Sequence, residues 1–209
     1  MSDTRRKLID GAIETIRTHG ISGVSARTIA TTAGVNQALV FYHFGSVHDL
    51  LGVASMTHAQ AAVATYQPYF DKVGTLKELL AVGRELHSGQ SATGNVMVLA
   101  QMLAGSQNDP ALAETTRAAL TLWTNAVEQV LDRVLADSPA TDLLDTGGLA
   151  RAVSAGFIGL ELFEGVDPEG ARQALDTLDQ LAMLVEVVDE LGPIARRAFR
   201  AKVKRVADR

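Results

Sequence analysis

The stretch Ser25–Leu51, SARTIATTAGVNQALVFYHFGSVHDLL, decides the fold of the N-terminal part of this chain. Ser25 is a favourable N-cap for a short helix, and Gly34 marks where that helix ends. A second short helix begins near Asn36. Two short helices that are joined by a glycine-containing turn, with the small Ala30 where they cross, predict a helix-turn-helix.

The beginning of the second helix carries side chains suited to contacting DNA. Asn36 and Gln37 are amides, which can pair with adenine through two hydrogen bonds in the major groove. Val40 and Phe44 are apolar and are expected to anchor the inner face of the same helix. The alternative interpretation is that Asn36 only caps the helix and that Gln37 is a solvated side chain. The pattern taken alone leaves both interpretations open.

A longer run of residues resembles a known family. The matching features, in chain order, are RRKLIDGAIETIRTHG at residues 5–20, Gly23–Ser25, Arg27–Ala30, Ala33–Val35, Val40–Phe44, Ser46, Asp49 and Leu50. Over residues 5–51 this ordered combination resembles the DNA-binding region of the TetR family of transcriptional repressors. The remainder of the chain fits the family in its length, its helical character and its Gly and Pro breaks.

The resemblance implies DNA-contacting roles at individual positions. Gln37, Ala38 and Leu39 occupy positions that read the major groove, and Arg27 one that reaches guanine or phosphate. Phe41, Tyr42 and His43 occupy positions of phosphate contact, and Ser25 directs a helix N-terminus at the backbone. The full set of expected DNA-binding residues is Arg6, Ser25, Arg27, Asn36, Gln37, Ala38, Leu39, Phe41, Tyr42 and His43.

Three positions depart from the usual pattern of the family. Phe41 stands where tyrosine is usual, Val47 where lysine is usual, and Leu39 where a threonine is common. The first two changes remove a hydroxyl donor and a positive charge, so we expect modest non-specific affinity for DNA. Arg5–Lys7 can compensate as a short N-terminal arm, or they are the solvated start of a helix.

The rest of the sequence reads as consecutive helices, without the alternation of apolar and polar residues that marks a strand. A long helix from Ser46 is expected to end near Pro68, and a Gly/Ser-rich joint at 88–91 is expected to separate two later helices. Further helices are expected over residues 110–136, 146–164, 168–191 and 194–206. The predicted fold class is all-α, with an N-terminal helix-turn-helix domain over residues 1–47 and a helical ligand-binding and dimerisation domain over residues 48–209.

The net charge of −5 argues against a nucleic-acid partner only until it is resolved along the chain. Residues 1–47 hold five basic and three acidic side chains. Residues 48–193 hold seven basic and twenty acidic side chains, and residues 194–209 hold seven basic and one acidic. The chain therefore has a mildly basic head, an acidic body and a basic tail. The tail carries Ile194, Ala198, Phe199, Val203 and Val206 at helical spacing, so we expect it to pack on the acidic body.

The body is expected to bind an effector and a second copy of the chain, because members of the family do so. The candidate effector-lining residues are Tyr66, Phe70, Met97, Met102, Trp123 and Phe157, although Met and aromatic residues at helical spacing are more often plain core. The candidate dimer contacts are Ala152, Gly156, Gly159, Leu178, Leu181 and Val185. An apolar or aromatic effector and a palindromic operator in double-stranded DNA follow as expected partners.

Other classes of protein are not indicated. Without cysteine the chain has neither disulfides nor thiolate sites, and its five histidines fall in no HExxH or triad pattern. We expect no catalytic residues, no metal site and no cofactor, and Glu161, Glu164 and Asp167 are interpreted as a solvated helix end. No segment resembles a signal peptide or a membrane span, so a cytoplasmic location is expected. The alternative function is a helical interaction protein that keeps the fold but has lost operator binding.

Overall fold

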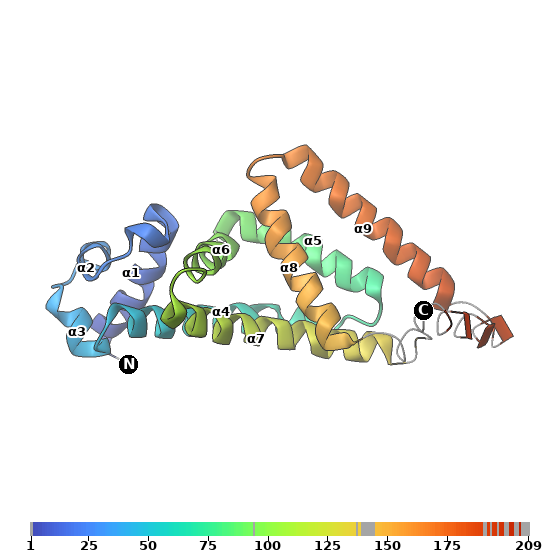
Figure 1. Cartoon of the computed structure of the whole chain (residues 1–209), viewed down its shortest axis with the longest axis horizontal. Helices are drawn as coiled ribbons and strands as arrows, with labels where there is room; N and C mark the ends of the chain where they lie inside the picture. Colours follow the sequence, from blue (N-terminus) through green and yellow to red (C-terminus); the bar gives the residue numbers. More distant parts are fainter. Residues whose placement is uncertain are drawn as a thin grey trace. The chain divides into compact units, whose positions relative to one another are not determined.

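Helices account for every regular element in the described part of the chain, as the sequence predicts. The computed structural model describes residues 2–93, 95–136, 138 and 145–189, together with 192, 194, 195, 197, 198, 201, 202 and 205 (Figure 1). The helices are α1 (Asp3–His19), a short 3-10 helix (Ile21–Gly23), α2 (Ala26–Ala33), α3 (Ala38–Phe44), α4 (Val47–Phe70), α5 (Leu76–Thr93), α6 (Asn95–Gly105), α7 (Pro110–Leu135), α8 (Thr146–Glu164) and α9 (Pro168–Asp189). The predicted all-α fold is confirmed.

The chain divides into two compact units. The first contains residues 1–65 and 90–123, and the second contains residues 66–89 and 124–209. The predicted division of the chain at residue 47 stays a prediction.

The core of the first unit forms around the apolar face of α1. Leu8, Ile9 and Ile16 are at most 1% exposed. They belong to one cluster with Ala12, Ile13, Ala26, Ile29, Ala30, Val40, Leu50, Leu51, Ala54, Val98, Met102 and Leu112. Burial of apolar side chains contributes about 1.5–3 kcal/mol for each large residue. This cluster therefore holds α1, α2 and α3 against α4 and α6.

The helix-turn-helix has the local structure that its sequence predicts. The Ser25 hydroxyl accepts the Thr28 N–H at 3.1 Å, and the Ser25 N–H donates to the Thr28 hydroxyl at 2.9 Å, which caps α2 from both sides. Gly34 ends α2 in the left-handed conformation with φ +66°. The Val35 N–H then donates to the Ala30 carbonyl at 3.0 Å, so the turn is closed before α3 begins.

One predicted helix end lies within two residues of the observed one, and one predicted joint between helices is wrong. α4 continues past Pro68 to Phe70, because a proline near the end of a helix removes only one N–H and the next turn still forms through the Asp71 N–H and the Gln67 carbonyl at 2.9 Å. The joint expected at 88–91 is helical, and α5 runs on to Thr93. Gly and Ser lower helix propensity by only about 0.5–1 kcal/mol each, which the rest of the fold overrides.

Other expectations lie at or beyond the limits of the described residues. Most of the loop expected over residues 137–145 lies outside them. In the basic tail, Ile194 is 87% exposed and Ala198 is exposed, whereas Phe199, Val203 and Val206 lie outside the described residues. The two described apolar residues therefore do not support packing of the tail. No helix within the described residues has both the length and the apolar character of a membrane span.

Replacing Gly34 with alanine should lower the free energy of unfolding by about 1 kcal/mol. No atom lies within 4 Å of the added Cβ, so the cost comes from the left-handed φ alone. The matched control is Gly52→Ala in α4, where the Cβ would lie 3.5 Å from the Thr115 hydroxyl and where φ is ordinary. That change should stabilise the helix by up to about 1 kcal/mol. Chemical unfolding followed by circular dichroism tests both, and equal effects of the two substitutions would contradict the strain at Gly34.

Candidate nucleic-acid interface

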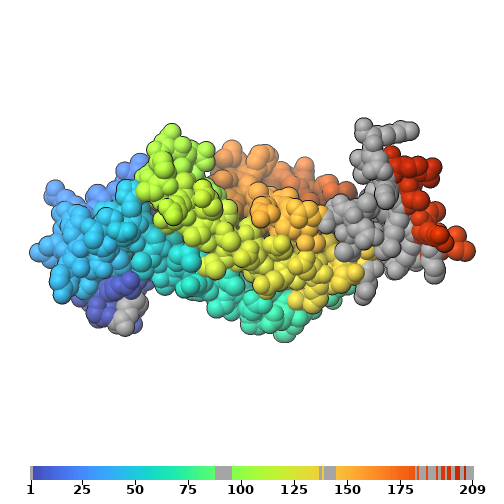
Figure 2. Space-filling model, turned by 60° about the horizontal axis from the view of Figure 1, so that its bottom comes forward, coloured from blue at the N-terminus to red at the C-terminus, as the bar shows by residue number. Residues whose placement is uncertain are grey.

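The helix α3 presents one face to the core and another to solvent. Val40 is fully buried, and Leu39 and Phe44 are half-buried against the same core cluster. On the opposite face Phe41 is 50% and Tyr42 is 80% exposed. The two aromatic side chains are neighbours on this face, and contiguous exposed apolar surface can mark an interaction site. The helix-turn-helix lies at the surface, in the lighter blue of Figure 2.

The start of α3 settles how Asn36 is used locally. The side-chain oxygen of Asn36 accepts the Ala38 N–H at 2.8 Å, and the Asn36 carbonyl accepts the Leu39 N–H at 3.0 Å. Asn36 therefore caps α3, as the second of its two interpretations from the sequence has it. Gln37 and Ala38 follow in the first turn with exposed side chains. Of the two amides, Gln37 is the one whose side chain has no capping role.

The basic residues before α2 belong to the first helix. Arg6 and Lys7 lie within α1 and make ion pairs with Asp3 at 3.0 and 2.8 Å. Hydrogen bonds and charge from Lys7, and then from Arg6, hold the pKa of Asp3 below its usual value. Both residues are therefore helical, because the helix begins at Asp3 with Ser2 as its cap, and contact of Arg6 with DNA stays a prediction.

Arg5 contributes to the position of α3. Its guanidinium lies 5.0 Å from the centre of the Phe44 ring, at the C-terminal end of α3. Such a cation–π contact contributes about 0.5–1 kcal/mol at an exposed site. Arg5 thus links the first turn of α1 to the end of α3.

The remaining expected DNA-binding residues lie around the same surface. Ser25 and Arg27 are exposed at the start of α2, and His43 is half-exposed on α3. Val47, which replaces the usual lysine, is half-buried and packs against the core of the first unit. Its position explains how an apolar residue is accommodated there: the side chain contributes packing where a lysine would contribute charge.

The expected effector-lining residues do not form a single group within either unit. Tyr66, Phe70 and Phe157 belong to the second unit, and Met97, Met102 and Trp123 belong to the first. Phe70 and Met102 are each 2% exposed, whereas Met97 is 42% exposed. The Ser55 hydroxyl donates to the Met102 sulfur at 3.0 Å, so Met102 has a packing role in the first unit. The effector pocket stays a prediction.

The expected dimer contacts lie on exposed faces of α8 and α9. Ala152, Gly156 and Gly159 are exposed on α8, and Leu178 and Leu181 are 44% and 52% exposed on α9. The side chain of Val185 lies outside the described residues. Large exposed apolar side chains are concentrated on these two helices and also include Val153, Leu162, Phe163, Met183 and Val187.

Glu161 and Glu164 form a polar cluster with His87 in the second unit, whereas from the sequence they are interpreted as a solvated helix end. Glu161 of α8 has a side chain only 10% exposed, and its carboxylate lies 2.5 Å from Nδ1 of His87 on α5. Glu164, one turn later, lies 3.3 Å from Nε2 of the same ring. These two glutamates are therefore not a solvated helix end. Their i, i+3 spacing is visible in the sequence, but the pairing with His87 joins residues that are 74 positions apart.

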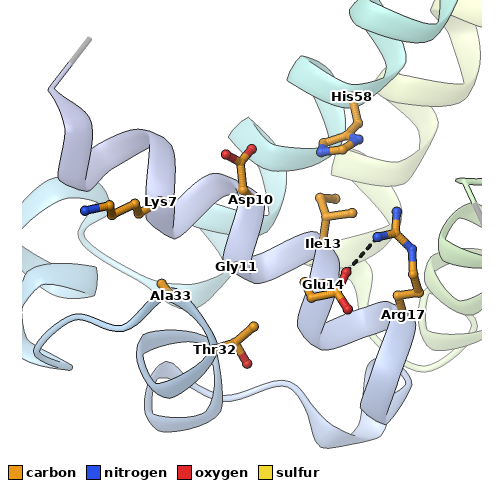
Figure 3. A pocket seen from close by; sticks show the side chains of 9 residues that line it. All are labelled: Lys7, Asp10, Gly11, Ile13, Glu14, Arg17, Thr32, Ala33 and His58. Atoms are coloured by element: carbon orange, nitrogen blue, oxygen red, sulfur yellow. Dashed lines mark hydrogen bonds and ion pairs between the residues drawn. The ribbon is translucent and has the colours of Figure 1, made fainter. Parts of the chain in front are cut away.

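A groove of about 440 Å³ lies in the first unit, between α1, α2 and α4 (Figure 3). It is lined by Lys7, Asp10, Gly11, Ile13, Glu14, Arg17, Thr32, Ala33 and His58. Burial lowers the pKa of His58 below its usual value of 6.5, with the charge of Asp10 acting in the opposite direction and that of Arg17 in the same one. The folded protein therefore disfavours protonation of this imidazole.

Replacing His58 with glutamine should reduce the loss of stability in acid. Because the pKa of His58 is lower in the folded state, the unfolded state takes up this proton first as the pH falls through about 6.5, and unfolding becomes easier. Urea unfolding of wild type and His58→Gln at intervals from pH 8 to pH 5 measures the effect. The two curves of stability against pH should be parallel near pH 8 and diverge below about 6.5. Parallel curves throughout would show that the burial of His58 carries no penalty.

Comparison with known proteins finds similarity to one family over the segment that contains the helix-turn-helix. Residues 8–53 match the family model described as bacterial regulatory proteins, tetR family. The nicotine-responsive transcriptional repressor HdnoR of Paenarthrobacter nicotinovorans is 25% identical over 181 residues, which cover 86% of this chain and 92% of HdnoR. Two solved structures share the fold. A Rhodococcus sp. protein named as a TetR-family transcriptional regulator has a TM-score of 0.71, with 21% identity over 87% of this chain and 100% of the other. FadR of Bacillus subtilis in complex with stearoyl-CoA has a TM-score of 0.69 and 16% sequence identity, and the match covers 90% of this chain and 99% of FadR.

The matched segment contains α2, α3 and the turn between them, whose exposed outer face is the candidate interface. A capped α2, a left-handed Gly34 and an α3 anchored by Val40 account physically for that match. Residues 8–53 of this chain are thus similar to the bacterial regulatory proteins of the tetR family, and the fold of the chain is shared with solved regulators.

Proposed function

We propose that the protein is a ligand-responsive repressor that binds a palindromic operator in double-stranded DNA as a homodimer. The observation that carries the proposal is the two-faced α3, with Val40 fully buried and with Phe41 and Tyr42 exposed on the other side. A helix of seven residues anchored in this way projects from the head as a rigid element that fits the major groove.

Within this proposal the side chains of α3 divide by role. Gln37, Ala38 and Leu39 at its first turn contact base edges, and Gln37 supplies the amide that pairs with adenine. Phe41, Tyr42 and His43 contact the sugar-phosphate backbone. Asn36 serves mainly to cap the helix, because its side-chain oxygen already accepts the Ala38 N–H.

The electrostatic part of binding rests on few groups. Arg27 is exposed at the start of α2, and the N-terminus of that helix adds a partial positive charge. Arg6 and Lys7 share one carboxylate, Asp3, which offsets one of their two charges. We therefore expect a shallow dependence of affinity on salt and a reliance on two heads acting together.

Dimerisation is proposed through α8 and α9. Ala152, Gly156 and Gly159 leave room for close approach of another helix, and no atom lies within 4 Å of a Cβ placed on either glycine. Leu178 and Leu181 add apolar surface on α9. Two apolar helices from each protomer would bury these side chains in a two-fold interface, which in turn gives the operator its two-fold symmetry.

A small apolar or aromatic effector is proposed to release the protein from DNA. The support is that the relative HdnoR is named as nicotine-responsive and that FadR of Bacillus subtilis was solved with stearoyl-CoA. Tyr66, Phe70 and Phe157, all of the second unit, are the proposed contacts. A regulator of this kind acts in the cytoplasm, without a catalytic step. The alternative is an interaction protein that keeps the fold, given the apolar Phe41 and Val47.

Selection of duplexes from random DNA with the purified full chain separates the two functions. A regulator enriches one two-fold sequence, which then shifts in a gel at low salt. If no sequence is enriched and no two-fold site emerges at low salt, the operator proposal fails and the interaction protein becomes the better description.

The substitution Gln37→Ala should change the preferred sequence at one position of each half-site. Loss of a paired amide costs about 1–3 kcal/mol of discrimination against the wrong base. The matched control is Gln129→Ala, an exposed glutamine of α7 in the second unit. Repeating the selection with both variants tests the register of α3. An unchanged sequence preference in Gln37→Ala would show that Gln37 reads no base.

The substitution Leu181→Glu should weaken self-association by at least about tenfold, since a charge replaces an apolar side chain in the proposed interface. Analytical ultracentrifugation over a range of concentrations measures the change. The control is Gln173→Glu, which adds the same charge at an exposed polar position of the same helix. Equal association of the two variants would exclude this face of α9 from the dimer.

A further inference from the structure

The cluster of His87, Glu161 and Glu164 has the composition and spacing of a metal site. His87 lies on α5, and the two glutamates lie one turn apart on α8, all within the second unit. The side chains of His87 and Glu161 are each 10% exposed, and that of Glu164 is 35% exposed. One ligand atom from each residue lies within 4.8 Å of the others.

These residue types suit a divalent transition-metal ion. Imidazole nitrogen and carboxylate oxygen both bind Zn²⁺ at about 2.0–2.2 Å, and three protein ligands leave a fourth position for water. Glu161 lies at Nδ1 and Glu164 at Nε2 of the ring, so one glutamate must turn to the side of the nitrogen that binds the ion, where ligand atoms lie roughly 3.4 Å apart. Rotation of the glutamate side chain supplies that movement, because Glu has three rotatable side-chain bonds.

The charge of the cluster also favours a cation. Two carboxylates face one imidazole, so the three side chains together carry a negative charge even when the ring is protonated. Arg84, one turn before His87, is already paired with Asp176 at 2.8 Å and Asp179 at 2.6 Å. Burial raises the pKa of Glu161, which reflects the cost of holding this carboxylate away from water. A bound cation offsets that cost.

An aromatic ring lies beside the imidazole of the cluster. The Phe157 ring lies edge-on to the His87 ring, with 6.4 Å between the ring centres, and forms an apolar wall beside it. Apolar surroundings weaken the competition of water for the metal ligands.

We propose that His87, Glu161 and Glu164 bind one divalent transition-metal ion of the Zn²⁺ class and thereby join α5 to α8. His87 gives one ring nitrogen and each glutamate gives one oxygen. The competing description is an imidazolium held between two carboxylates without a metal. The proposal concerns metal binding in the absence of DNA, so its outcome does not depend on operator recognition.

Titration of the chelator-treated full chain with Co²⁺ tests the site directly, because Co²⁺ bound to nitrogen and oxygen ligands absorbs visible light. We expect a saturable absorption band at one equivalent per chain, which Zn²⁺ then displaces. Zn²⁺ should also raise the melting temperature of the protein, since it binds the folded state. Absence of a saturable band would overturn the proposal and leave the imidazolium description.

Variants assign the ion to the cluster. His87→Gln and Glu164→Gln should each weaken Co²⁺ binding by at least about tenfold. Glu114→Gln, an exposed carboxylate of α7 in the first unit, should bind as wild type does. If His87→Gln fails to fold by circular dichroism, Glu164→Gln decides, because Glu164 is the most exposed of the three side chains. Equal affinity in Glu164→Gln and Glu114→Gln would show that the metal binds elsewhere.

Discussion

The close approach of α1 and α2 is the constraint on which the recognition surface depends. A Cβ placed on Gly11 would lie 2.8 Å from the Cβ of Ala33, so the two helices meet at a distance that only a glycine on α1 permits. At that distance Ile29 of α2 reaches the apolar face of α1. The side chain of Ile29 and the apolar side chains on that face are then almost fully buried. Thr15 adds a polar link across the same contact, with its hydroxyl 3.1 Å from that of Thr32. The turn at Gly34 then has a fixed base from which α3 projects.

Among the described residues, two groups of exposed apolar side chains each correspond to one proposed interaction. On α3 they are Phe41 and Tyr42, beside a buried anchor. On α8 and α9 they form a broader surface that includes Phe163 and Leu181, with exposed glycines between them. Each surface leaves apolar area in water, which is a cost that binding of DNA or of a second protomer removes. Dimer symmetry matters strongly for the proposed function, because the head carries few uncompensated positive charges.

The errors of sequence reasoning have a common physical origin. Ser88–Ser91 carries a local signal for a helix end, but Gly and Ser lower helix propensity by only about 0.5–1 kcal/mol each, and other interactions of the fold override that signal. The sequence around Arg6 and Lys7 is equally consistent with an arm or a helix, and the ion pairs with Asp3 place both residues in α1. In contrast, Ser25 and Gly34 act through capping and backbone geometry, which depend on a few adjacent residues, and the structure confirms both.

The amino-acid sequence by itself determined the all-helical class and the helix-turn-helix, because periodicity, capping and turn chemistry are properties of neighbouring residues. It also placed Gln37 at the start of the second short helix. Only the tertiary structure decided that Val47 packs into the core and that His87 meets Glu161 and Glu164. A contact between residues 74 positions apart leaves no periodic signal in a single sequence, so the burial of these charged groups could be learned only from the fold.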